Sequence, residues 1–285
     1  MIKDITLGQF FPGNSILHRL DPRAKILISM LYIAMIFVAT SVASMLAVTL
    51  LTLLLPIVAH ISAKTAWGAV KPLRFVILIM LILFIFSGKG EGYHILWTFD
   101  YGFLHLTVSI EGIIKALAVS LRIILLVLSV SVILSYTTSP IALADGIESL
   151  LSPLKAFRVP VHDFAMMLTI AMRFIPILIE ETDKIMSAQA ARGADFTTGS
   201  LARRAKALIP VFVPLLVSSV RHADNLATAM ECRLYSGGKK RTRMRALVFT
   251  RRDFFALFAA SLLLIGMTVF ASRVMPIWWL GFHYV

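Results

Sequence analysis

The sequence predicts an all-α integral membrane protein with about five transmembrane helices and a cytoplasmic region of long amphipathic helices. Hydrophobic residues make up 59% of the 285 positions and charged residues only 15%, and the mean hydropathy is +0.87. An ordinary soluble protein carries charge on about a quarter of its residues. The 28 Lys and Arg outnumber the 15 Asp and Glu, and most of this excess falls between residues 137 and 252. Lipid-facing and water-facing parts are therefore separated along the chain.

Five apolar runs can cross a hydrocarbon layer of roughly 30 Å, with help from flanking residues in the shorter cases. The runs are residues 24–42, 44–60, 75–87, 112–136 and 254–272. Only Thr40, Ser41 and their neighbours separate the first two runs, which suits a tight helical hairpin. Residues 88–110 are rich in glycine and aromatic side chains, so we expect an interfacial loop there.

The distribution of Lys and Arg predicts the orientation in the membrane. The N-terminal segment through Lys25 holds four, the link at 61–74 holds three, and the region 137–252 holds seventeen, whereas the opposite side holds only Lys89 and Arg273. The positive-inside rule then places the N-terminus and region 137–252 in the cytoplasm of a multi-pass plasma membrane protein.

This pattern divides the chain into three parts. Residues 1–136 carry transmembrane helices one to four, residues 137–252 form the cytoplasmic region, and residues 253–285 carry the fifth helix.

The cytoplasmic region contains two long series of apolar residues with helical spacing. One series starts at Phe164, and the other runs from Leu208 to Met230. Each recurs every three or four residues, as one face of a helix does. Helices of about 30 residues would be roughly 45 Å long, too long to fold back into a small core. We expect them to lie along the membrane surface and against each other.

Both long helices are expected to end in an arginine followed by a turn. Ala191, Arg192 and Gly193 end the first, and Glu231, Cys232, Arg233 and Leu234 end the second. One interpretation is local, because arginine complements the negative end of a helix dipole and glycine is the usual residue of the turn. The other interpretation is recognition, because each guanidinium offers five donors that can bind a carboxylate in a partner.

Arg122 lies inside the fourth apolar run, and its position there also has two interpretations. Burying a charge in lipid is costly, which makes such a residue a functional candidate. Alternatively, its side chain reaches the interface or satisfies backbone carbonyls.

Three blocks make the chain resemble the T-components of energy-coupling factor transporters. The blocks are Gly8–Ser15 with His18–Lys25, then Arg173–Pro176 with Ala188–Phe196, and finally Arg221–Gly238. The resemblance spans nearly the whole chain, and two arginine motifs in this order are fairly specific to the family.

The resemblance implies a set of partners and the residues that meet them. Two cytoplasmic ABC-type ATPases would receive the helix tips, through Ala191, Arg192, Gly193, Glu231 and Arg233. A membrane-embedded, substrate-binding S-component would lie against the long helices, with Met166, Met167, Phe174, Phe212 and Leu215 as candidate contacts. The family function would be to transmit ATP-driven motion of the ATPases to the S-component for uptake of vitamins or other micronutrients.

The second motif departs from the family pattern, because Leu234 stands where glycine follows the arginine. We expect the tight turn to come later, at Gly237 and Gly238.

The sequence also limits other functions. It has no glycine-rich phosphate loop ending in Gly-Lys-Ser or Gly-Lys-Thr, so ATP and magnesium are expected on partner ATPases and no cofactor on this chain. With this hydropathy, the positive charge favours membrane lipid or acidic proteins as partners over nucleic acid. No Cys and His cluster has metal-ligand spacing.

A stand-alone ion-coupled permease is the alternative, although most spans lack an interior carboxylate or histidine. A membrane-embedded enzyme would need a catalytic cluster, and the seven histidines are scattered.

Overall fold

The computed structural model describes residues 10–86, 95–101, 104–157, 161–196, 200–235 and 247–273. The chain divides into two compact units. Residues 8–146 and 247–285 form one, here the membrane unit, and residues 1–7 and 147–246 form the other, here the hairpin unit. Helices dominate both units, which confirms the predicted all-α class.

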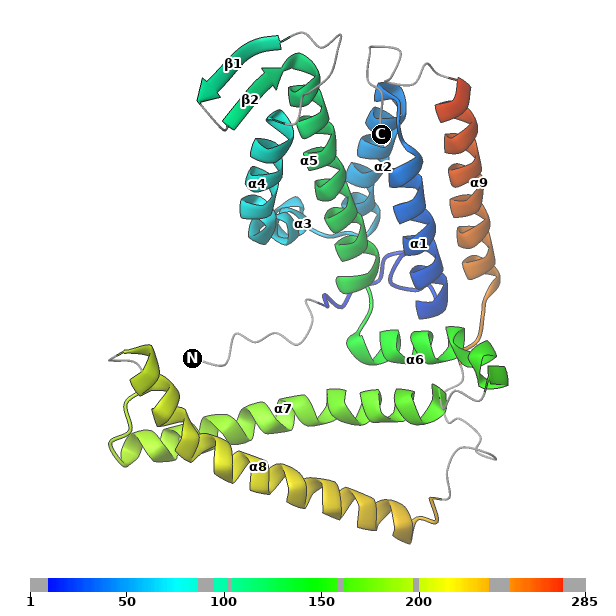
Figure 1. The fold of residues 1–285 in the computed structure, drawn as a ribbon. Helices are drawn as coiled ribbons and strands as arrows, with labels where there is room; N and C mark the ends of the chain where they lie inside the picture. Colours follow the sequence, from blue (N-terminus) through cyan, green and yellow to red (C-terminus); the bar gives the residue numbers. More distant parts are fainter. Residues whose placement is uncertain are drawn as a thin grey trace. The chain divides into compact units, whose positions relative to one another are not determined.

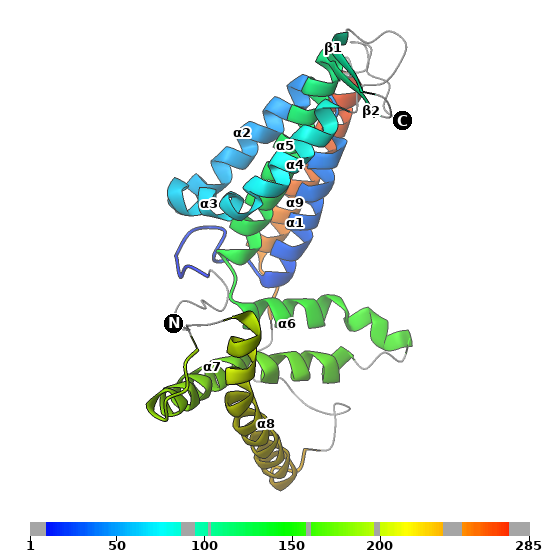
Figure 2. The same cartoon turned by 60° about the vertical axis from the view of Figure 1, so that its left-hand side comes forward.

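The membrane unit is a bundle in which five helices run side by side (Figures 1 and 2). They are α1 (Pro22–Val38), α2 (Val42–Val58), α4 (Arg74–Ile85), α5 (Ile110–Val130) and α9 (Arg251–Arg273). The short helix α3 (Ala63–Val70) lies at the foot of α4, and a 3₁₀ turn over Lys71–Leu73 joins the two. One π-helical turn, Ser131–Ser135, extends α5. These helices coincide with the five predicted apolar runs.

Two groups of buried side chains hold the bundle together. One group joins α3 to α5 and to the segment before α1, and it comprises Leu17, Leu20, Ala59, Ala66, Val70, Leu128, Val132 and Tyr136. The other joins α1, α2, α5 and α9, and it comprises Met35, Ile36, Ala39, Val48, Leu125 and Met267. The bundle therefore has an apolar interior, while most of its other large apolar side chains point outward, as in a protein surrounded by lipid.

Helix length and composition alone select a different set of five membrane spans. They are Ala63–Ile85, Gly112–Ser135, Val161–Ala191, Arg204–Cys232 and Arg251–Phe270. Helices α1 and α2 are outside this set, but each has 17 residues, which is about 26 Å and still within the range that spans a bilayer. Both pack inside the bundle, so we assign them as spans. The two long helices that replace them carry acidic side chains, such as Glu180 and Asp183 on one, and their placement along the membrane surface stays a prediction.

The segment expected to be an interfacial loop contains a β-hairpin. Strands β1 (Ile95–Tyr101) and β2 (Leu104–Ser109) pair antiparallel, with Phe99 opposite Leu106. The strands differ from the expected loop, because aromatic residues next to glycine suit a membrane interface as well as a strand. Alternation over six or seven residues is also the signal of a strand.

Hydrogen bonds to two charged side chains connect the starts of α1 and α9 with the segment that follows the π-helical turn. The Asp253 carboxylate accepts hydrogen bonds from the backbone N–H groups of Asp21, at 2.7 Å, and Thr250, at 2.8 Å. The buried ammonium of Lys25 donates to the Thr137 carbonyl at 2.8 Å and to the Thr138 hydroxyl at 3.2 Å. These bonds fasten the starts of α1 and α9 to the end of the π-helical turn.

Arg122 on α5 reaches the turn between α1 and α2. Its guanidinium donates to the Ala39 carbonyl at 3.1 Å, which is the C-cap of α1. This contact favours the structural reading of Arg122, since the side chain satisfies a backbone group that the end of a helix leaves open.

The hairpin unit contains the two longest helices, α7 (Val161–Ala191) and α8 (Leu201–Cys232). They follow α6 (Pro140–Leu150), which begins in the membrane unit and ends in the hairpin unit, and a 3₁₀ segment, Ser152–Phe157. Helix α6 begins with Pro140 in its first position, and the Ser139 hydroxyl accepts a hydrogen bond from the Ala142 N–H at 3.3 Å. Both long helices continue through their internal prolines.

Candidate functional site: the two arginine tips

Helices α7 and α8 run antiparallel and cross. Along the pair, the Gln189 side-chain amide donates to the Pro210 carbonyl at 3.5 Å, and the ring centroids of Phe174 and His222 lie 6.0 Å apart. Because the helices are antiparallel, the C-terminal end of α7 and the C-terminal end of α8 lie at opposite ends of the pair (Figure 1). A helix with the 32 residues of α8 is about 48 Å long.

The first tip ends α7 in a tight glycine turn. The N–H of Ala194 donates to the Gln189 carbonyl at 3.0 Å, and the N–H of Gly193 donates to the Ala190 carbonyl at 2.9 Å. This pair of bonds is the Schellman motif, which requires a left-handed residue after the helix. Gly193 supplies it with φ at 89°, a conformation that glycine adopts without steric cost.

The second tip has the same hydrogen bonds with leucine in place of glycine. The N–H of Tyr235 donates to the Met230 carbonyl at 3.0 Å, and the N–H of Leu234 donates to the Glu231 carbonyl at 2.8 Å. Leu234 itself is left-handed, with φ at 57°. The expectation that the turn would come later was therefore wrong, because backbone hydrogen bonding imposes the turn despite the leucine side chain. Gly237 and Gly238 lie outside the described residues.

Both tips present their arginines to solvent. Arg192 and Arg233 are exposed, as are Ala191, Gly193 and Glu231. Among the residues that the structure describes, neither guanidinium has a hydrogen bond or an ion pair. The structure thus gives two similar turns, each with an exposed arginine just before the left-handed residue.

A polar cluster joins the helices near the middle of the pair. The Ser218 hydroxyl donates to one oxygen of the Glu181 carboxylate, and the other oxygen lies 3.8 Å from Nδ1 of His222. The sequence predicts that all three residues lie on the long helices, but it does not predict that they contact one another. Their spacing gave one signal: Ser218 and His222 are four residues apart, so they lie on one face of α8.

An apolar groove of about 410 Å³ opens between the N-terminal half of α7 and the C-terminal half of α8. Its lining comprises Met167, Ile170, Ala171, Phe174, Leu178, Ser219, Ala223, Leu226, Ala227 and Met230. Of the five candidate S-component contacts, only Met167 and Phe174 line this groove. Phe212 is 63% exposed elsewhere on α8, and Met166 and Leu215 are half-buried. Next to Phe212, Val211 is buried. The contact of these five residues with an S-component stays a prediction.

Within the described ranges, no cluster of three or more His, Cys, Asp or Glu side chains could hold a metal ion.

Together these features define a class: a multi-pass, all-α plasma membrane protein that carries two exposed arginine tips on a pair of long crossed helices. Residues 13–244 match the family described as CbiQ, cobalt transport protein. The chain belongs to this family, whose relatives below are named as transmembrane components of energy-coupling factor transporters.

Three relatives show how much of the chain the likeness covers, and each is named energy-coupling factor transporter transmembrane protein EcfT. The protein of Ruminiclostridium cellulolyticum is 48% identical over 253 residues, which are 89% of this chain and 92% of the relative. That of Clostridium kluyveri is 46% identical over 280 residues, 98% of this chain and 99% of the relative. That of Bacillus subtilis is 40% identical over 253 residues, 89% of this chain and 93% of the relative.

Proposed function

We propose that this chain is the coupling subunit of an energy-coupling factor importer for vitamins or other micronutrients. In this role it transmits ATP-driven motion from two cytoplasmic ATPases to a membrane-embedded S-component. The observation that carries the proposal is the pair of matching tips, because two exposed arginines in equivalent turns fit two equivalent grooves on a pair of related ATPases.

Each tip is suited to dock in a partner. A guanidinium without a partner among the described residues can bind a carboxylate through two parallel hydrogen bonds. The Schellman turn reverses the chain directly after Arg192 and Arg233, so the arginine stands at the very end of its helix. Ala191, Gly193 and Glu231 complete the proposed docking surface.

The crossing converts movement of the tips into movement of the groove. Arg192 lies about 16 Å along α7 from Glu181, and Arg233 lies about 22 Å along α8 from Ser218. A rigid helix that pivots at the crossing therefore moves its two arms in opposite directions. When the ATPases draw the tips together, the angle between the helices changes, and the groove between the arms changes with it.

The groove is the proposed contact surface for the S-component. It is lined mainly by apolar side chains and includes Met167 and Met230. Methionine adapts its shape to different partners, because it is unbranched and polarizable. Met166, Phe212 and Leu215 would extend this surface along the two helices.

Reconstitution into vesicles tests this function against the permease alternative. A coupling subunit gives substrate uptake only when the ATPases, the S-component and ATP are all present. The chain alone, given an ion gradient and no ATP, is then expected to transport nothing. Uptake by the chain alone would show instead that it is a secondary transporter.

A further inference from the structure

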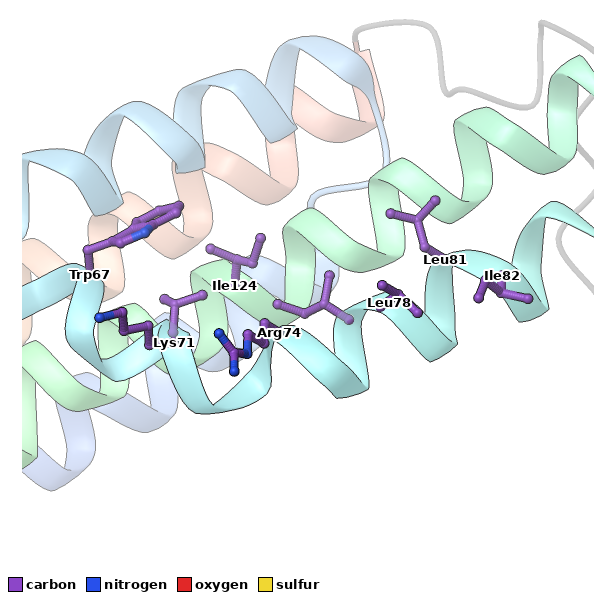
Figure 3. Close-up of a pocket in the computed structure, with 9 residues that line it drawn as sticks. Trp67, Lys71, Arg74, Leu78, Leu81, Ile82 and Ile124 are labelled. Carbon is purple, nitrogen blue, oxygen red and sulfur yellow. The ribbon is translucent and has the colours of Figure 1, made fainter.

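The outer face of α3 and α4 carries a second groove, separate from the arginine tips and confined to the membrane unit (Figure 3). Its volume is about 680 Å³. The groove is lined by Trp67, Val70, Lys71, Arg74, Ile77, Leu78, Leu81, Ile82 and Ile124.

The local sequence explains why these side chains share one face. Ala66 and Val70 are buried against the bundle at 3% and 5% exposure, and this leaves Trp67 and Lys71 on the neighbouring outward face of the helix. The spacing of three and four residues continues through Arg74 into α4. A 3₁₀ turn carries the chain past Pro72, whose ring has no N–H to donate to a helix.

The groove separates charge from apolar surface along its length. Lys71 and Arg74 lie at one end with Trp67, and Leu78, Leu81 and Ile82 continue along α4 (Figure 3). Both cations are exposed, and within the described part of the chain neither has a hydrogen bond or an ion pair. Trp67 is 58% exposed although it is the largest side chain of the wall.

We propose that this groove binds an anionic phospholipid, with its phosphate between Lys71 and Arg74 and an acyl chain along α4. The guanidinium offers a planar fork of donors to the phosphate, and the ammonium adds a compact charge. Tryptophan favours the level of the headgroups, where its ring is apolar and its N–H is wet. From Arg74 to Ile82, α4 advances about 12 Å, a length that a lipid chain can cover.

Charge complementarity favours a lipid over a protein segment as the occupant. The groove needs one molecule with negative charge at one end and a continuous apolar body beside it. A phospholipid of an anionic leaflet has this structure, and basic residues near such a leaflet attract it. The bound lipid would hold α3 at the membrane interface and set the depth at which α4 enters the bilayer.

Fluorescence of Trp67 tests the site directly. The full chain is prepared with Trp97, Trp278 and Trp279 changed to Phe, so that Trp67 alone emits. It is placed in vesicles of phosphatidylcholine or of phosphatidylglycerol whose acyl chains carry bromine, which quenches tryptophan on contact. Comparing mixtures of brominated and plain lipids gives the relative affinity of the site for the anionic lipid.

We expect phosphatidylglycerol to be preferred, and either Lys71→Gln or Arg74→Gln to reduce that preference about fivefold. Lys64→Gln is the matched control: Lys64 is an exposed lysine of α3 that does not line the groove, so its loss leaves the preference within twofold of wild type. Equal quenching by both lipids, or a preference that survives the double variant, would overturn the proposal. Absence of quenching by either lipid would also overturn it, because Trp67 would then face protein.

Discussion

Leu234 adopts a backbone conformation that residues with a side chain rarely take. Its φ is 57°, where Cβ crowds the following carbonyl oxygen at a cost of roughly 1–2 kcal/mol. The side chain is 88% exposed, so packing within the described chain does little to offset that cost. An exposed leucine held in this conformation is a candidate contact for a partner, because strain of this kind tends to occur at functional sites.

Leu234→Gly is expected to make the end of α8 more stable. Removal of the side chain relieves the strain, so the amide of Tyr235 should exchange with solvent about fivefold more slowly, the effect of about 1 kcal/mol on local opening. Hydrogen exchange followed by mass spectrometry measures this rate.

Gly193→Leu is the matched control at the other tip. Nothing lies within 4 Å of the added Cβ, so only the left-handed φ of 89° opposes the leucine. This variant should speed exchange at Ala194. If both variants leave exchange unchanged, the two tips do not share the turn described here.

Some of these residues could be identified from the sequence and others could not. Arg192 and Arg233 are visible as helix-ending arginines, because charge and turn residues are local signals. The left-handed Leu234 was not predicted, since propensity argues against it and only the hydrogen bonds of the turn favour it. For Arg122 the sequence left two roles open, and its bond to the Ala39 carbonyl favours the structural one.

The crossing of α7 and α8 depends on polar contacts as well as apolar ones. Glu181, Ser218 and His222 meet there, while the neighbouring groove is lined almost entirely by apolar side chains. Hydrogen bonds are directional, so this cluster fixes which part of α7 lies over which part of α8.

A double-mutant cycle tests whether this cluster joins the helices. Glu181→Ala and Ser218→Ala should each destabilise the chain. Their combined effect should differ from the sum by about 0.5–3 kcal/mol, as for residues in direct contact. Stability is measured by denaturant unfolding of the chain in detergent. Glu180→Ala with Ser218→Ala is the control pair, because Glu180 is exposed and neighbours the cluster only in sequence. An additive result for both pairs would show that the crossing does not depend on the cluster.

At the level of elements, the sequence predicted long helices well and short ones poorly. The five spans and both long helices appear because apolar runs and three-and-four spacing extend over many turns. The sequence did not predict the hairpin of β1 and β2 or the separate helix α3, since seven or eight residues give few repeats of either the strand period or the helix period. The sequence did not predict the groove beside Trp67 either, because the groove depends on how α3 packs and α3 was not predicted as a helix.

In the whole molecule, the C-terminal end of α8 is expected to lie on the cytoplasmic side of the membrane. Cys232 is the only cysteine of the chain and its thiol is exposed. A maleimide that cannot cross membranes should therefore label it in inside-out vesicles and not in intact cells.

A cysteine on the opposite side provides the control for this orientation. Thr40 is exposed in the turn between α1 and α2, so Thr40→Cys in a Cys232→Ser background should show the reverse labelling. Labelling of Cys232 from outside intact cells would contradict the orientation predicted from the positive charges.

Co-purification of the ATPases tests the central claim most directly. The tagged chain is isolated from native membranes as wild type, as the double variant Arg192→Glu and Arg233→Glu, and as a control with Lys184→Glu and Arg221→Glu. The control reverses two exposed cations on the same helices away from the tips. We predict that wild type and control retain two ATPases and an S-component, and that the double variant retains the S-component but loses the ATPases. Retention of both ATPases by the double variant would contradict the account, because the arginine tips would then not be where they dock.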